Sequence, residues 1–231
     1  MAAVILAVTT DIFVVRGSGV LTTQDRDVSD FYSIALSGQG TIIIDQTGKE
    51  SLKVTAEDNL IDRIETAVVG NVLKIELKKE RFFWSFWPTK KIEYHISVDD
   101  LNQIVINGSG TIETDSLKAQ GLSIRIRGSG NGDMKIEAAD LWINISGSGK
   151  LVMSGYTQNQ TVNINGSGNY ESEELESEHG AITINGSGKA VVEAVDELVV
   201  NINGNGNIKY LGDPMIDQQI SGSGKVSKYK E

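Results

Sequence analysis

The chain of 231 residues lacks cysteine altogether and contains only two prolines and two histidines. The absence of cysteine excludes disulfides, thiolate catalysis and a cysteine-linked lipid anchor within this sequence. No apolar run approaches the ~20 residues with which a helix spans a bilayer, so we expect no transmembrane span. The 25 glycines, combined with so little proline, indicate tight corners rather than a disordered tract.

Basic residues are also scarce, because 21 Lys and Arg stand against 31 Asp and Glu, and the net charge is −10. Such a charge argues against a nucleic-acid partner, whose phosphates would be repelled, and against simple attraction to anionic membranes. The apolar stretch at residues 2–8 lacks a preceding basic segment and a clear cleavage site. Residues 1–10 are therefore either the remnant of an export signal or a first strand.

A short sequence motif is repeated seven times between residues 101 and 227. It consists of alternating apolar and polar residues followed by a Gly-X-Gly triplet. Successive triplets begin 18 to 20 residues apart, and an isoleucine stands two positions before each of them. These isoleucines are Ile106, Ile126, Ile145, Ile164, Ile184, Ile202 and Ile220.

Apolar residues two apart predict a strand with one buried face. The same residue at the same place in every strand predicts a solenoid, because equivalent side chains of successive coils become neighbours about 4.8 Å apart. We therefore predict an all-β fold, a parallel β-helix with coils of about 19 residues. The isoleucines should form an inner ladder, and the polar residues between them an outer ladder of hydrogen-bonding amides.

The glycines of the seven triplets are the predicted corners, because a sharp turn between strands needs φ > 0 or the absence of a Cβ atom. They are Gly108, Gly110, Gly128, Gly130, Gly147, Gly149, Gly166, Gly168, Gly186, Gly188, Gly204, Gly206, Gly222 and Gly224.

Two earlier triplets, at residues 17–19 and 38–40, follow the same sequence pattern. Val15 and Leu36 stand two positions before them, where the later repeats have isoleucine, and we assign both to this isoleucine column. Between residues 41 and 100 the repeat is absent. Several segments there are nevertheless typical of strands, and Gly70-Asn71 is typical of a hairpin turn.

The change from an irregular to a periodic sequence suggests how the chain is organised. We take residues 11–100 as a less regular N-terminal β lobe of larger coils and residues 101–231 as the regular array. Together they form one continuous domain from 11 to 231.

The repeated corner, together with Arg16-Gly-Ser-Gly, Phe31-Tyr-Ser-Ile-Ala-Leu-Ser-Gly38 and Glu57-Asp-Asn-Leu-Ile61, resembles the bacterial family called putative auto-transporter adhesin, head GIN domain. The resemblance covers roughly residues 13 to 226. It implies a right-handed parallel β-helix in the cell envelope or outside the cell. No catalytic or ligand residues come with it.

The polar positions of the repeat predict an outer-face binding ladder, with chiefly Asn, Thr, Ser and Gln, two Arg and no carboxylate. Its candidate members are Arg125, Arg127, Asn144, Asn163 and Asn201. The two arginines would bind a carboxylate or sulfate, pair with neighbouring Asp or Glu, or face solvent. Enzymes that cleave polysaccharides need clustered carboxylates, and we expect no catalytic residues here. For His95 and His179 we expect no catalytic partner, whether Ser, Cys or an acidic residue, and we predict neither metal nor cofactor.

An aromatic run stands out because five of the fourteen aromatic residues fall within six positions. They are Phe82, Phe83, Trp84, Phe86 and Trp87. A strand cannot bury consecutive aromatics on one face, so some should protrude unless a second surface covers them. The run is a loop that plugs the end of the N-terminal lobe, a subunit interface, or a contact with a membrane or with sugar rings.

Three functions follow as hypotheses. The first is a non-enzymatic bacterial envelope or surface protein, periplasmic or extracellular, that binds a polysaccharide or an envelope protein or serves as a structural module. The second is a polysaccharide lyase or hydrolase on a β-helix of the pectin-lyase type. The third is a homo-oligomeric assembly protein that uses the aromatic loop at residues 82–87.

Overall fold

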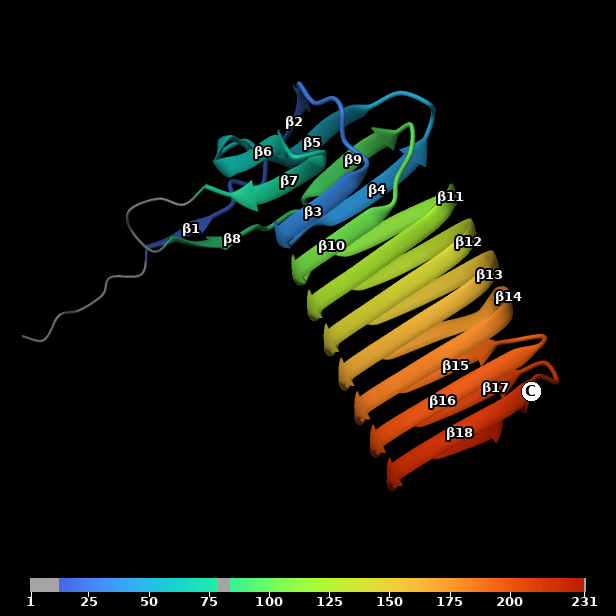
Figure 1. The fold of residues 1–231 in the computed structure, drawn as a ribbon. Helices are drawn as coiled ribbons and strands as arrows, with labels where there is room; N and C mark the ends of the chain where they lie inside the picture. The colour runs from blue at the N-terminus through green and yellow to red at the C-terminus, as the bar shows by residue number, and fades with distance from the viewer. Residues whose placement is uncertain (1–12, 79–83, 231) are drawn as a thin grey trace, which may run out of the picture.

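The computed structural model describes residues 13–78 and 84–230, and within them the chain is almost entirely β (Figure 1). A long stack of strands forms the C-terminal part of the chain. The N-terminal strands cross one end of this stack at an angle.

The described residues of the N-terminal part form one short helix and nine strands. These are β1 (Phe13–Arg16), β2 (Leu21–Arg26), β3 (Ser33–Gly38), β4 (Thr41–Gln46), β5 (Ser51–Glu57), the 3₁₀ helix η1 (Ile61–Arg63), β6 (Ile64–Val69), β7 (Val72–Leu77), β8 (Trp84–Trp87) and β9 (Glu93–Val98).

The stack contains the remaining strands. These are β10 (Gln103–Gly108), β11 (Thr111–Gly128), β12 (Asn131–Gly147), β13 (Lys150–Gly166), β14 (Asn169–Gly186), β15 (Lys189–Glu193), β16 (Glu197–Gly204), β17 (Asn207–Leu211), β18 (Met215–Gly222) and β19 (Lys225–Lys228).

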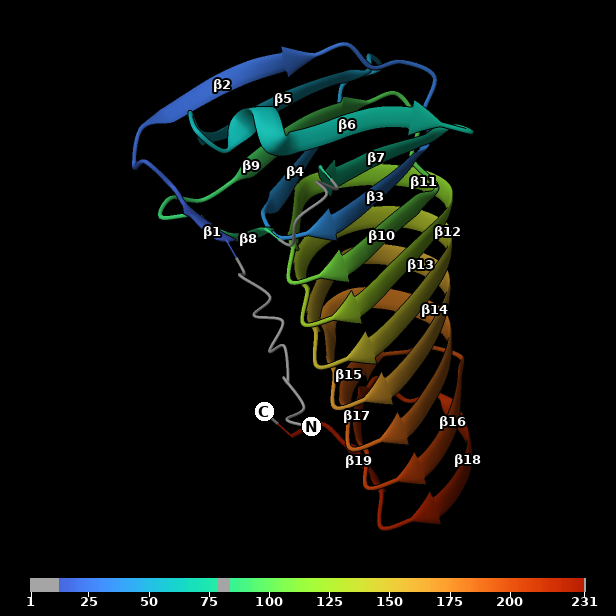
Figure 2. The same ribbon diagram turned by 90° about the vertical axis from the view of Figure 1, so that its left-hand side faces the viewer.

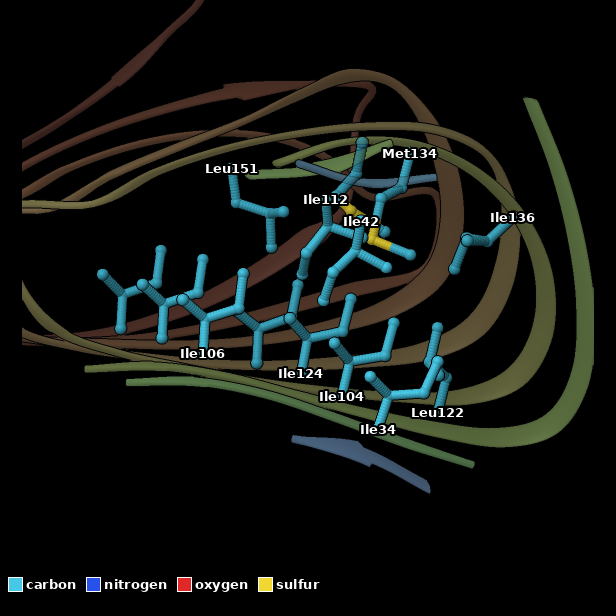
Figure 3. Packing of buried hydrophobic residues seen from close by; sticks show 14 of the residues in the cluster. Ile34, Ile42, Ile104, Ile106, Ile112, Leu122, Ile124, Met134, Ile136 and Leu151 are labelled. Atoms are coloured by element: carbon cyan, nitrogen blue, oxygen red, sulfur yellow. The ribbon is translucent and has the colours of Figure 1, made fainter. Parts of the chain in front are cut away.

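The inner isoleucine ladder is confirmed. Ile106, Ile126 and Ile145 are direct partners in parallel strands, and the same register continues to Ile220. From Ile106 to Ile202 the ladder residues are at most 1% exposed. Figure 3 looks into this core, where the side chains of the two faces point toward one another. Burial of each isoleucine stabilises the fold by roughly 1.5–3 kcal/mol.

Opposite the glycine corners, each coil bends smoothly rather than turning sharply. Strands β11 to β14 are 17 or 18 residues long and curve from one face of the stack to the other (Figure 2). In the two later coils the bend instead separates two shorter strands, β15 from β16 and β17 from β18. Irregular register between Thr114 and Leu117 and between Val152 and Ser154 accompanies the bend.

The two glycines of each triplet have different reasons to be glycine. Gly128 has φ +120°, and a Cβ there would lie 2.5 Å from the carbonyl oxygen of Gly108 on the preceding coil. That carbonyl already accepts the Ser129 amide at 2.9 Å. At Gly130, which has no such φ, a Cβ would lie 2.9 Å from Cγ2 of Ile106. The first glycine therefore allows the turn, and the second leaves room for the isoleucine ladder.

The stack begins earlier than its regular repeat. Strand β3 pairs with β10, so that Ile34 lies on Ile104 and Leu36 on Ile106, although 70 residues separate the partners. Leu36 therefore belongs to the isoleucine column, as predicted. Strand β4 pairs in the same way with the start of β11. The chain between β4 and β10 is an excursion from one coil.

That excursion is not a set of larger coils, which corrects the prediction for this lobe. Strands β7 and β9 do lie parallel to β3 and β4. Beyond them, however, β6, β5 and β2 pair antiparallel. Gly70 and Asn71, with φ +57° and +63°, form the predicted hairpin turn between β6 and β7. Tight reversals of this kind give antiparallel neighbours, which cover the end of the stack.

The first triplet does not join the stack, and the assignment of Val15 to the isoleucine column is wrong. Strand β1 pairs with β8 in a separate two-stranded sheet, with Val15 opposite Phe86. The corner formed by this first triplet lies against the carboxylate of Glu57, whereas the later corners lie against a neighbouring coil. This carboxylate accepts hydrogen bonds from the Gly19 amide at 2.7 Å and from the Thr89 amide at 2.8 Å.

The last coil differs from the others at its inward positions. Gln218 stands in register with Val200, and Lys228 with Tyr210. All eight residues of β18 are exposed, and even Ile220 is 38% exposed. A terminal coil with polar residues at inward positions is suited to contact with water.

The corner account predicts that Gly128→Ala destabilises the protein by about 2–4 kcal/mol, because alanine is strained at this φ and its Cβ strikes a carbonyl oxygen. Ser129→Ala, at the exposed middle position of the same triplet, should change the free energy of unfolding by less than about 0.5 kcal/mol. Urea denaturation of both variants measures the difference. Equal midpoints for the two would contradict the account.

The Glu57 contacts predict a pH dependence. Burial raises the pKa of Glu57, but hydrogen bonds from Thr89, Gly19 and Lys90 outweigh it and lower the pKa below the usual 4.5. The stabilisation by this carboxylate is therefore complete above about pH 4.5 and is lost as the pH falls through the lower folded-state pKa.

Glu57→Gln should reduce stability at pH 7, because its amide NH₂ would face the Thr89 N–H. The stability difference between wild type and variant, followed by denaturation from pH 7 to pH 3, should shrink below about pH 4.5. A difference that stays constant over this range would show that the charge of Glu57 has no part in the corner.

Candidate functional site

The outer face of the stack is built by the same alternation that fills the core. Between inward isoleucines, every second side chain of the strands points outward, and parallel register places equivalent positions of successive coils side by side. Ser123, Trp142 and Thr161 form one such outward row. Arg125, Asn144 and Asn163 form the next row, two residues further along each strand.

These two rows enclose a shallow groove of about 420 Å³ across β10, β11, β12 and β13. Apart from the buried Ile143, the residues that line it are polar or aromatic, and none has a carboxylate. These polar and aromatic residues are Gln103, Ser123, Arg125, Trp142, Asn144, Thr161 and Asn163. Three members of the predicted outer ladder, Arg125, Asn144 and Asn163, therefore lie together in one groove.

Trp142 is the largest exposed group of this groove, with 47% of its surface accessible. Its indole leans toward Gly121 on the neighbouring strand, where an added Cβ would lie 3.0 Å from Cζ3 of the ring. Glycine at position 121 and the small Ser123 beside it leave the ring room to lie against the sheet. The arrangement offers a flat aromatic surface surrounded by hydroxyl and amide groups.

Arg125 is exposed and, among the described residues, makes no ion pair or hydrogen bond of its side chain. Of the three outcomes that the sequence allowed for the arginines, pairing with a neighbouring Asp or Glu is therefore not the one found. Arg127, two residues further on, differs because its guanidinium donates to Oδ1 of Asn107 at 3.4 Å. The carboxylate of Asp140, two residues before Trp142 on β12, accepts a hydrogen bond from the side-chain amide of Asn159 at 2.9 Å.

An amide ladder does form, in the outward column next to the corners. The Asn185 side chain donates to Asn165 at 2.9 Å, and Asn203 donates to Asn185 at 2.9 Å. Asn201, the fifth predicted ladder member, lies in the column of Asn163 but on a coil beyond the groove.

Both histidines have acidic neighbours, which corrects the sequence analysis. His95 Nε2 lies 3.3 Å from Glu93. His179 lies with Glu178 and Asp196, and their candidate ligand atoms are all within 4.8 Å of one another, a set that could hold a metal ion. The Tyr156 hydroxyl donates to Glu178 at 2.7 Å, and this hydrogen bond, with partial desolvation and the charges of Glu178 and Glu176, raises the pKa of Tyr156. Stacking brings Asp196 to Glu178 from the next coil, which single-strand spacing does not reveal.

A second hollow, of about 470 Å³, lies at the bend of the coils opposite the glycine corners. Two carboxylates line it, those of Asp100 and Glu137. Lys118 pairs with Glu137 at 2.6 Å. This hollow therefore differs from the groove at Trp142, because it is lined by carboxylates and the groove is not.

The aromatic run is only partly within the described residues. Phe82 and Phe83 lie outside them. The run continues as strand β8, paired parallel with β1, rather than as the predicted loop, because a backbone partner is available there. Trp87, at the end of β8, is 67% exposed.

Trp142 is the site residue that sequence reasoning missed. A signal was present, since no other aromatic residue stands in its column, which also holds Gln103, Ser123, Thr161, Ala181, Val199 and Asp217. A single tryptophan at an outward position of a repeat indicates a local feature and not a property of the ladder.

No helix in the described part of the chain has the length and apolar character needed to cross a membrane. A family model described as "Putative auto-transporter adhesin, head GIN domain" matches residues 30–214. None of the curated proteins compared with the chain matches it.

Several solved structures are similar over nearly the whole chain. A putative adhesin from Bacteroides fragilis is 27% identical with a TM-score of 0.87, covering 93% of this chain and 100% of that one. A protein named putative lipid binding protein, from Parabacteroides distasonis, is 28% identical with a TM-score of 0.76, covering 94% and 100%. A putative adhesin from Parabacteroides merdae shares the fold at 21% identity, with a TM-score of 0.75 and coverage of 94% and 100%.

Proposed function

The chain belongs to the putative auto-transporter adhesin, head GIN domain family, and from this premise we propose that it is a non-enzymatic envelope or surface module. In this proposal it binds polysaccharide on the outer face of its β-helix. The observation that carries the proposal is the groove in which Trp142 lies among hydroxyl and amide side chains.

The chemistry of the groove matches that of a sugar. A pyranose ring has a face of C–H groups and a rim of hydroxyls. The indole of Trp142 supplies an apolar, flat surface for the face. Ser123, Thr161, Asn144 and Asn163 supply both donors and acceptors for the rim. Successive coils repeat such groups about every 4.8 Å, so an extended chain of sugars would meet them again along the stack.

The same lining supports the proposal of a binding role without catalysis. Cleavage of a glycosidic bond requires a pair of carboxyl groups on either side of it. Neither of the two rows around Trp142 contains one. The carboxylates of the hollow at the bend lie elsewhere, and one of them is paired with Lys118. We therefore favour binding over a lyase or hydrolase.

The proposed location is outside the cytoplasm, at the cell surface or in the envelope. The adhesin names of the family and of the similar structure from Bacteroides fragilis support this assignment. A polysaccharide-binding face is also most useful where cell-wall, capsular or host glycans are present.

Glycan-array and affinity measurements test the proposal. Wild-type protein should bind at least one polysaccharide class at micromolar concentration. Trp142→Ala should weaken that binding by about tenfold or more, equivalent to ~1.4 kcal/mol, because exposed aromatic anchors carry a large share of binding energy.

Trp87→Ser is the matched control, since it removes another exposed tryptophan from a strand distant from the groove. It should leave the affinity for a soluble oligosaccharide unchanged. Absence of binding to any glycan, or equal losses in the two variants, would contradict the proposal.

A second candidate function rests on the exposure of Trp87 at the end of β8. If this strand mediates homo-oligomers, wild-type protein should sediment as an oligomer, and Trp87→Ser should shift it toward the monomer. Analytical ultracentrifugation at several concentrations decides the matter. A wild type that already sediments as a monomer would remove this candidate.

A further inference from the structure

The groove contains a cationic group whose partner is not within the described chain. Resting on the proposed function, we propose that the Trp142 groove selects acidic sugars. In the complex, Arg125 binds the carboxylate or sulfate of a sugar whose ring lies on Trp142.

Arg125 has no ion-pair partner within the described residues. The chain has 31 acidic residues for 21 basic ones, so an exposed arginine has ample opportunity to pair. Its guanidinium nevertheless contacts no acidic residue in the described ranges, although it lines the groove. Guanidinium presents paired N–H donors in a planar fork that fits a carboxylate or sulfate. An external anion would satisfy these donors.

Arg125 also lies close to Trp142 in the parallel register of the stack. The two residues lie on adjacent coils, because Ser123 is the register partner of Trp142 and Arg125 that of Asn144. They are diagonal neighbours on one face, and both line the same groove. A sugar ring resting on the indole therefore has its rim within reach of the long arginine side chain.

The charge of the outward side chains changes sign on either side of Trp142 along the strand direction. Asp140 lies two residues before Trp142 on β12, whereas Arg125 lies level with Asn144, two residues after it. The indole therefore stands between a carboxylate and a guanidinium. An acidic sugar would be repelled at the Asp140 side and attracted at the Arg125 side, which gives it a single favoured orientation.

Arg127 provides a matched control within the same strand. It carries the same charge on the same outward face as Arg125, but it donates to Asn107 and does not line the groove. Arg125→Gln and Arg127→Gln change the net charge of the protein equally. A difference between them therefore reports a local contact and not the overall charge.

The experiment uses two pairs of probes. The members of each pair share the same sugar backbone, and one member is charged whereas the other is neutral. One pair is oligogalacturonate and its fully methyl-esterified form, which tests a carboxylate. The other is dextran sulfate and dextran oligomers of equal length, which tests a sulfate. Affinities are measured by calorimetry near physiological ionic strength, where charges beyond about 8 Å are largely screened.

We expect wild-type protein to bind the acidic member of at least one pair about tenfold or more tightly than the neutral member. Arg125→Gln should remove this preference, and Arg127→Gln should change it by less than about twofold. Because both arginines are exposed, thermal melting curves of the variants should match that of the wild type.

The outcomes separate this inference from the proposed function. If wild type binds both members of each pair equally, and Trp142→Ala weakens both, then polysaccharide binding stands and acid selectivity is overturned. Equal losses in Arg125→Gln and Arg127→Gln would also overturn it, since net charge alone would explain them. If no probe and no glycan on an array is bound, the proposed function fails and the inference fails with it.

Discussion

Coil-on-coil stacking is the interaction on which the rest of this structure depends. A single coil exposes its apolar face, so each one is stable only against its neighbours. Backbone hydrogen bonds fix the distance between coils, and Ile126 packing on Ile106 and Ile145 fixes the register. The corner glycines serve the same contact, because a Cβ at Gly128 would separate it from Gly108. Shape, core and surface pattern all follow from this one repeated contact.

The same register that builds the core also positions the candidate site. Residues far apart in sequence, such as Gln103 and Asn163, become neighbours in one groove because they occupy equivalent outward positions on successive coils. The outward columns on this face of the stack hold mostly small, hydroxyl or amide side chains. The groove differs because Trp142 and Arg125, which has no side-chain partner within the described residues, interrupt that pattern on adjacent coils. Specific recognition on a repetitive scaffold therefore depends on a few exceptional residues.

Periodicity made the array predictable from sequence, since Ile126, Ile145 and Ile164 recur at a spacing that only stacking explains. It predicted less well where the period fails. Val15 precedes a triplet like any other, yet the strand after it pairs antiparallel, and Glu57 binds the amide of Gly19 from 38 residues further along the chain. The groove was predicted in part: Arg125, Asn144 and Asn163 stand in a column that the sequence analysis assigned to the outer ladder, whereas Trp142 stands in the column before it. The neighbourhood of His179 and Asp196 arises from stacking across coils at the bend, where no repeated motif marks the register.

The central claim is that one groove on the outer face of the stack recognises a sugar. The most direct measurement is an NMR titration that follows the three tryptophan indole N–H signals as oligogalacturonate is added. The account predicts that the Trp142 signal shifts with saturation, while those of Trp84 and Trp87 stay in place. Shifts confined to Trp84 and Trp87, with Trp142 unmoved, would contradict it and move recognition to the strand β8.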